Sequence, residues 1–183
     1  LKEASYRWGD WLVKPAGREN KAIFSMKIEP RGLSVNAGRY LLPPLDIGGT
    51  AFFPFAGSGT PSRIDGRCRA VSLEALRPLS PQLARHEAGG WAEGRLSGVK
   101  KGQATAAYLW QGDLVLQKAS FRIPEQGGIF RELSGTLRWA GGGISTTGLS
   151  GSYGKTPFTL AGTVTDLDNP VYEVNFAAPF VHA

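Results

Sequence analysis

The chain has 183 residues, of which 25 are glycine and 12 are proline, and it has a formal net charge of +6. This composition is typical of a β-rich chain with many turns, in one domain or two small ones. No run approaches the roughly 18 apolar residues that a membrane-spanning helix needs, and a single cysteine excludes an internal disulfide. Because the first residue is Leu1 rather than methionine, we expect an excerpt of a longer protein, with any signal or anchor outside it.

Residues 1–60 are expected to form an irregular β segment, with strands at 6–13, 22–28, 39–42 and 45–55. Turn-forming residues separate these strands, among them Pro30-Arg31-Gly32, and Pro43-Pro44 cannot lie inside a central strand. A boundary with a second unit, residues 61–183, is expected near residue 60.

The second unit begins with an alternating strand at 63–71 and then has a helical signal near 72–87. Ser72 and the pair Ser80-Pro81 stand where helix N-caps are expected. Leucines at three- and four-residue steps give the helical segment a narrow apolar stripe. We therefore predict a short helical plug lying against a sheet, followed by a strand at 91–96.

The rest of the chain is predicted to be an antiparallel meander with strands at 104–110, 114–117, 119–123, 133–140, 143–149, 158–164 and 171–177. Gln111-Gly112-Asp113, Gly141-Gly142 and Asp168-Asn169-Pro170 are among the expected turns. The predicted fold is thus mainly β, an antiparallel glycine-rich meander that forms a curved sheet or groove, with one short helical segment.

Alternation along these strands predicts a sheet with one apolar and one polar face. Apolar faces of this kind either bury one another, as in a β-sandwich, or line a trough that a ligand fills. The residues expected to line such a trough are Phe121, Ile123, Phe158, Leu160, Val164, Val174 and Phe176.

The sequence contains no recognisable motif for a catalytic, metal-binding or phosphate-binding site. His86 and His182 are the only histidines, and with one cysteine they lack the spacing of a zinc site. His86 follows the helical stripe and is expected to face solvent. Gly57-Ser58-Gly59 does not match a nucleophile elbow, and the glycine-rich pieces do not match a phosphate loop. We therefore expect a non-enzymatic protein without a cofactor or metal.

The basic residues do not have the pattern of a nucleic-acid reader. Arg63, Arg67 and Arg69 occupy alternate positions with no aromatic residue between them, whereas single-strand binders place stacking aromatics among their basic residues. We expect a solvated strand face here and no nucleic-acid partner. Attraction to anionic lipid headgroups is the second possibility.

The order of features over residues 62–181 resembles the AsmA-like superfamily, which includes TamB-type and YhdP-type envelope proteins. The motifs that carry the resemblance are, in order, Gly66, Ser72-Leu73-Glu74-Ala75-Leu76, Leu83, Gly94-Arg95-Leu96-Ser97-Gly98, Gly112-Asp113-Leu114-Val115-Leu116, Phe121, Leu133-Ser134-Gly135-Thr136-Leu137, Gly151-Ser152-Tyr153-Gly154 and Phe158-Thr159-Leu160-Ala161-Gly162-Thr163-Val164. The match rests on their order rather than on any single side chain.

This resemblance implies a periplasmic protein of the bacterial envelope, held in the inner membrane by an anchor outside this fragment. It also implies an apolar β-groove for phospholipid acyl chains, used in lipid transport or outer-membrane biogenesis, and contacts with other envelope proteins. Two alternatives remain from the residues alone. One is a closed β-sandwich that binds proteins or glycans, with tryptophans at its rim, and the other is a structural spacer within a longer envelope protein.

Overall fold

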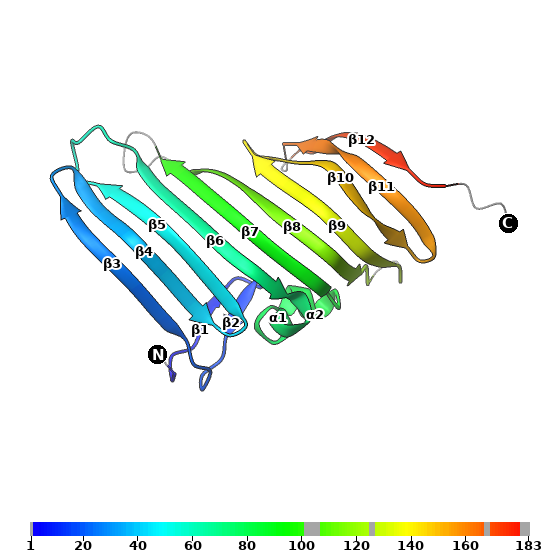
Figure 1. The fold of residues 1–183 in the computed structure, drawn as a ribbon, viewed down its shortest axis with the longest axis horizontal. Helices are drawn as coiled ribbons and strands as arrows, with labels where there is room; N and C mark the ends of the chain where they lie inside the picture. Colours follow the sequence, from blue (N-terminus) through cyan, green and yellow to red (C-terminus); the bar gives the residue numbers. More distant parts are fainter. Residues whose placement is uncertain (1, 101–106, 125–126, 167–168, 180–183) are drawn as a thin grey trace.

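The computed structural model describes residues 2–100, 107–124, 127–166 and 169–179. These residues form an antiparallel sheet of ten strands in sequence order, here called the main sheet, and a separate two-stranded ribbon (Figure 1). The main sheet is open, with β3 at one edge and β12 at the other. The mainly β, antiparallel meander predicted from the sequence is therefore confirmed.

The strands of the main sheet each pair with their neighbours in sequence. They are β3 (Lys21–Glu29), β4 (Gly32–Leu42), β5 (Leu45–Pro54), β6 (Ser62–Ser72), β7 (Gly89–Lys100), β8 (Leu109–Arg122), β9 (Ile129–Ala140), β10 (Gly143–Tyr153), β11 (Thr156–Thr165) and β12 (Val171–Ala177). The main sheet is continuous across residue 60, because Ile47 of β5 pairs with Cys68 of β6.

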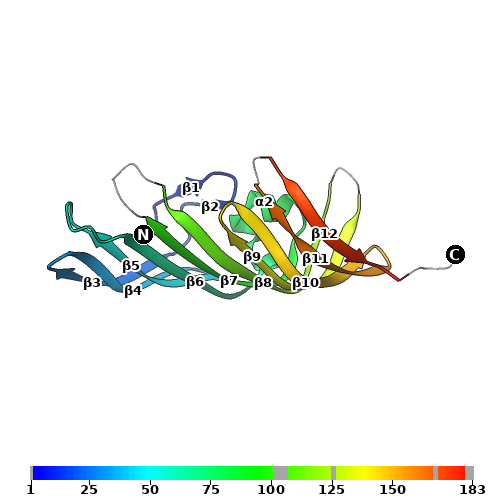
Figure 2. The ribbon, with the colours of Figure 1, turned by 90° about the horizontal axis from the view of Figure 1, so that it is seen from above.

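The predicted helical segment lies between β6 and β7. It consists of α1 (Leu73–Leu76), a 3-10 turn (Arg77–Leu79) and α2 (Pro81–Arg85). The Ser72 hydroxyl accepts a hydrogen bond from the Ala75 amide at 3.3 Å, and the Ser80 hydroxyl accepts one from the Leu83 amide at 3.4 Å, so both predicted N-caps are formed. The helical segment and the ribbon lie on the concave side of the curved main sheet (Figure 2).

The ribbon replaces the single strand that we predicted at residues 6–13. Its strands are β1 (Tyr6–Trp8) and β2 (Leu12–Lys14), and Gly9 in the turn between them has a φ of 56°. This left-handed conformation is readily available to glycine, so Gly9 reverses the chain where the alternation alone suggested a continuous strand.

The predicted turn Gln111-Gly112-Asp113 is wrong, because all three residues lie inside β8. A Cβ atom on Gly112 would come within 2.3 Å of both the Arg95 carbonyl oxygen and the Trp139 ring. Glycine is therefore required here by close packing and not by a turn. Part of the predicted strand at 104–110 falls on residues 101–106, which lie outside the described residues.

The compact core lies between the helical segment and the middle of the main sheet. Ala119, Leu133 and Phe158 form its buried cluster, and Leu73 of α1 packs against them. Within the described ranges the only sheet on the concave side is the two-stranded ribbon, so the main sheet has no second sheet of comparable size to pack against as in a sandwich. Large areas of that face are consequently left without a protein partner.

Candidate functional site

The concave side of the main sheet is an apolar surface that crosses all its strands. Cross-strand partners share a face of a sheet, so the strand pairings assign each residue to one face. One continuous row of partners runs from β3 to β12 through Phe24, Gly38, Gly49, Gly66, Leu96, Gly112, Trp139, Ile144, Val164 and Tyr172. We call the side of the sheet that holds this row the apolar face.

The apolar face has very few charged groups. Among the paired positions of the described strands, Lys100 at the end of β7 is its one charged residue. Yet much of this face is open to solvent, as Phe24, Met26 and Ile28 on β3 show with exposures of 58%, 56% and 78%. Exposed apolar surfaces larger than a few hundred Å² are rare on monomeric soluble proteins and mark sites of interaction.

Beneath the helical segment the apolar face deepens into a cavity of about 740 Å³. Leu73, Leu76 and Leu83 form one wall, and residues of β6 to β9, including Leu114 and Phe121, form another. The volume lies within the roughly 300–1,000 Å³ typical of small-molecule sites. The helical segment therefore leaves room for an apolar ligand between itself and the main sheet.

Aromatic rings extend the apolar face from this cavity to the β12 edge. Phe121 and Phe130 lie 4.9 Å apart between ring centroids, Phe130 and Phe158 lie 5.8 Å apart, and Phe158 and Phe176 lie 5.6 Å apart. Tyr153 joins this aromatic row at 4.9 Å from Phe130. The row links β8, β9, β11 and β12 across one surface, with Tyr153 contributed by β10.

The structure places the predicted trough residues in different environments. Phe121 is half-buried and lines the cavity, and Phe158 is buried in the core at 6% exposure. Leu160 and Val164 are half-buried on the apolar face of β11. Val174 and Phe176 are exposed on the same face of β12.

Ile123 lies just beyond the end of β8 and is also half-buried. Its amide donates a hydrogen bond to the Gly128 carbonyl oxygen at 2.9 Å, and its own carbonyl accepts one from the Gly127 amide at 2.9 Å. These bonds place Ile123 in the turn between β8 and β9. It therefore stands at the margin of the apolar face.

Sequence reasoning missed the contribution of the first strands and of the aromatic residues Phe130 and Tyr153. Phe24, Met26 and Ile28 alternate within the predicted strand 22–28, so a signal was present although no role was assigned to them. Alternation along the sequence assigns Phe130 to the wrong face, because β9 has a bulge at Glu132, whose φ is 55°. This bulge places Phe130 and Leu133 on the same face although their spacing is odd.

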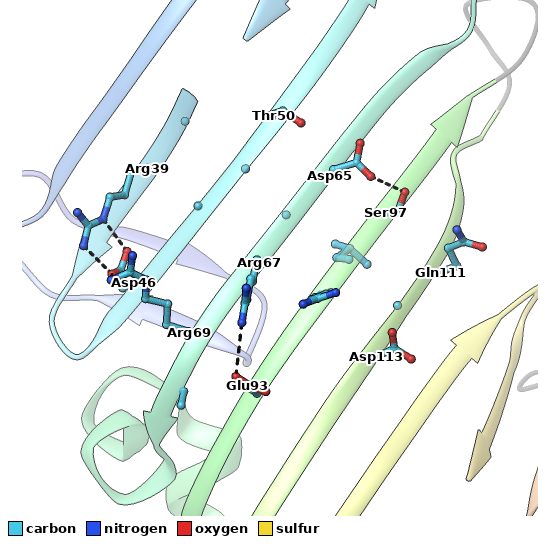
Figure 3. Close-up of a pocket in the computed structure, with 18 of the residues that line it drawn as sticks. Arg39, Asp46, Thr50, Asp65, Arg67, Arg69, Glu93, Ser97, Gln111 and Asp113 are labelled. Atoms are coloured by element: carbon cyan, nitrogen blue, oxygen red, sulfur yellow. Dashed lines mark hydrogen bonds and ion pairs between the residues drawn. The ribbon is translucent and has the colours of Figure 1, made fainter. Parts of the chain in front are cut away.

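The opposite side of the main sheet is polar, and several of its arginines form ion pairs with carboxylates on neighbouring strands (Figure 3). It contains an open hollow of about 1210 Å³, in which Arg39 donates to both carboxylate oxygens of Asp46 at 2.9 and 2.7 Å. Arg67 lies 4.0 Å from Glu93. Ion pairs between exposed groups contribute little to stability, and this set indicates a solvated face, not an anion site.

The ion pair also changes the titration of Asp46. The hydrogen bond and charge of Arg39 lower the pKa of the Asp46 carboxyl, and Arg69, at 3.5 Å, acts in the same direction. The Asp46 carboxylate thus stays ionised at neutral pH. Of the arginines on the polar face, Arg39 and Arg69 lie beside Asp46, Arg67 beside Glu93 and Arg138 beside Asp113.

His86 differs from our expectation that it faces solvent. Its side chain is half-buried, lines the cavity beneath the helical segment, and places Nδ1 3.0 Å from the Arg122 carbonyl oxygen. Because a carbonyl can only accept, this geometry assigns the proton to Nδ1. Cys68 also lines the cavity, and burial together with the nearby Asp46 charge raises the pKa of its thiol.

Within the ranges that the structure describes, no group of histidine, cysteine, aspartate or glutamate side chains has the arrangement of a metal site. The helices in those ranges are also too short to cross a membrane. Comparison of the chain with models of known families, with curated proteins and with solved structures found no match.

Proposed function

We propose that the apolar face is a non-enzymatic binding surface for the acyl chains of phospholipids. The observation that supports this most strongly is the continuous apolar row from Phe24 to Tyr172, which remains open to solvent at both edges of the main sheet. A folded chain that leaves such a surface uncovered has a partner for it. An acyl chain matches a surface that is long, apolar and without specific polar groups.

The energetics are compatible with this role. Each methylene moved from water to an apolar surface contributes about 0.8 kcal/mol, so about ten buried methylenes contribute roughly 8 kcal/mol before the cost of ordering. Such binding needs no dedicated hydrogen bond, which agrees with the small number of polar side chains on the apolar face. The cavity of about 740 Å³ offers the deepest part of this surface.

The resemblance to the AsmA-like superfamily sets the proposed biological context. In this proposal the chain is a periplasmic part of an envelope protein that is anchored in the inner membrane, and it supports lipid transport or outer-membrane biogenesis. The order of motifs over residues 62–181 supports this context, and the curved open sheet has the form that such a groove requires.

Native mass spectrometry of the purified chain, followed by organic extraction and lipid analysis, tests the acyl-chain proposal. The informative pair of variants lies on β12, where Val174→Asp introduces a charge on the apolar face. Asn175→Asp introduces the same charge at the adjacent exposed position of the polar face. We expect bound phospholipid in the native chain and in Asn175→Asp, and loss of lipid in Val174→Asp.

Circular dichroism must show that both variants remain folded, so that loss of lipid reports the surface and not unfolding. A native chain that carries no lipid after purification, and takes up none from phosphatidylethanolamine–phosphatidylglycerol vesicles, would contradict the proposal. Equal lipid retention in the two variants would also contradict it.

A further inference from the structure

The two edges of the main sheet are free within the described chain. No described strand pairs with the outer side of β3 or of β12, and nearly every residue of both strands is exposed. A free edge presents a row of unpaired amide and carbonyl groups that can template another strand. Neither strand contains a proline that would block such pairing.

We infer that β12 of one copy pairs with β3 of a second copy, so that the main sheet continues head to tail from molecule to molecule. The direction of the strands permits this arrangement. An odd number of antiparallel steps separates β3 from β12, so these two strands run antiparallel to each other. A translated second copy therefore meets β12 with an antiparallel strand and keeps the alternation of the whole sheet.

The side chains of the two edges are complementary in one register. With Glu173 opposite Lys27, an acidic residue meets a basic one on the polar face. The same register puts Phe176 opposite Phe24 on the apolar face. The remaining pairs are Val171 with Glu29, Tyr172 with Ile28, Val174 with Met26, Asn175 with Ser25 and Ala177 with Ile23.

Other registers fit less well. A shift by one residue would place the apolar residues of β12 beside the polar residues of β3. A shift by two residues in one direction would place Glu173 opposite Glu29, and opposed like charges destabilise a strand pair. The shift in the other direction leaves Glu173 opposite the neutral Ser25.

This inference goes beyond the acyl-chain surface and does not depend on it. Head-to-tail pairing joins two different patches, so it gives open chains unless the rotation between copies closes a ring. It would also make the apolar faces of successive copies continuous, because Phe24 and Phe176 lie on the same side of the sheet.

A charge exchange tests the pairing of Lys27 with Glu173. Both side chains are exposed on the polar face, so their reversal should leave the fold intact. In sedimentation analysis of the 183-residue chain at low salt, we expect concentration-dependent association. Lys27→Glu and Glu173→Lys should each weaken the association constant roughly fivefold, and the double variant should restore it.

A disulfide test fixes the register and the symmetry. In a Cys68→Ser background, Ser25→Cys combined with Asn175→Cys should give a ladder of dimers, trimers and larger species on oxidation, because directly opposed Cβ atoms lie about 4.5–5.5 Å apart. Each single variant should form no disulfide-linked oligomer, although it should still associate non-covalently. A chain that sediments as a monomer at all concentrations would overturn the inference. Dimers formed by Ser25→Cys alone would also overturn it, since they would indicate β3 pairing with β3.

Discussion

Phe158 and Phe176 stack with their ring centroids 5.6 Å apart, yet Phe158 is 6% exposed and Phe176 is 62% exposed. Two neighbouring rings on one face of the main sheet thus belong to different environments. Phe158 is part of the core with Ala119 and Leu133, whereas Phe176 lies where the apolar face meets solvent. This difference in exposure separates residues that stabilise the fold, such as Phe158, from residues that remain available to a ligand, such as Phe176.

Truncation of these two rings should therefore have different effects on stability. Removal of a buried phenylalanine leaves a cavity and costs about 3–5 kcal/mol, so we expect Phe158→Ala to lower the free energy of unfolding by that amount. Phe176→Ala should lower it by less than about 1 kcal/mol, because the ring is exposed. Denaturant unfolding followed by circular dichroism measures both, and equal losses would place Phe176 in the core.

Gly112 and Gly148 provide a matched pair of glycine substitutions. A Cβ at Gly112 would overlap the Arg95 carbonyl oxygen and the Trp139 ring, whereas a Cβ at Gly148 would meet no atom within 4 Å. Forced overpacking costs about 1–3 kcal/mol, so Gly112→Ala should destabilise the fold by that amount. Gly148→Ala should change the free energy of unfolding by less than about 1 kcal/mol. If Gly112→Ala leaves the free energy of unfolding unchanged, this would contradict the close packing of β7, β8 and β9.

Glu74 should contribute to the loss of stability in acid. Its carboxylate accepts a hydrogen bond from the Gly90 amide at 2.9 Å and one from the Ser72 hydroxyl at 2.8 Å, and these bonds lower its pKa. A lowered folded-state pKa stabilises the fold above the unfolded pKa of about 4.3, and this stability is lost as the pH falls through the folded value.

Glu74→Gln removes that titration. We therefore expect the melting temperature of the variant to fall less than that of the native chain between about pH 6 and pH 3, although the variant is less stable at neutral pH. Thermal unfolding by circular dichroism at a series of pH values checks this. If the melting temperatures of the two proteins fall in parallel with pH, the contacts of Glu74 do not form in solution.

Cys68 offers a chemical readout of the cavity. Burial and the Asp46 charge raise the pKa of its thiol, so little reactive thiolate forms near pH 8. Alkylation by iodoacetamide should be slow in the folded chain and fast after unfolding. Because Cys68 lines the cavity beneath the helical segment, a bound acyl chain should slow alkylation further. Unchanged alkylation in the presence of lipid would place the lipid elsewhere.

The sequence was sufficient to predict the meander because local signals dominate an antiparallel sheet with neighbouring connections. Alternation located β6, β11 and β12, and Ser72 and Ser80 marked the helix starts through their own hydroxyl groups. These features depend on residues that are close in sequence. They can therefore be recognised without knowledge of the tertiary structure.

The errors arose where tertiary contacts decide the local structure. Gly112 resembled a turn residue because its close contact with Trp139 is made across strands. The half-burial of His86 and the core position of Phe158 likewise depend on how the helical segment lies on the main sheet. The extent of the apolar face required the strand register, which assigns Phe24 and Tyr172 to one side of the sheet.

Site-specific photo-crosslinking to phospholipid tests the central claim most directly. Benzoylphenylalanine would be placed at Phe24, Leu96 or Val174 on the apolar face, and at Thr50, Ser97 or Asn175 on the polar face, in chains exposed to phospholipid vesicles. The acyl-chain account predicts lipid adducts at the first three positions and almost none at the other three. Equal crosslinking on both faces, or adducts confined to the polar face, would contradict it.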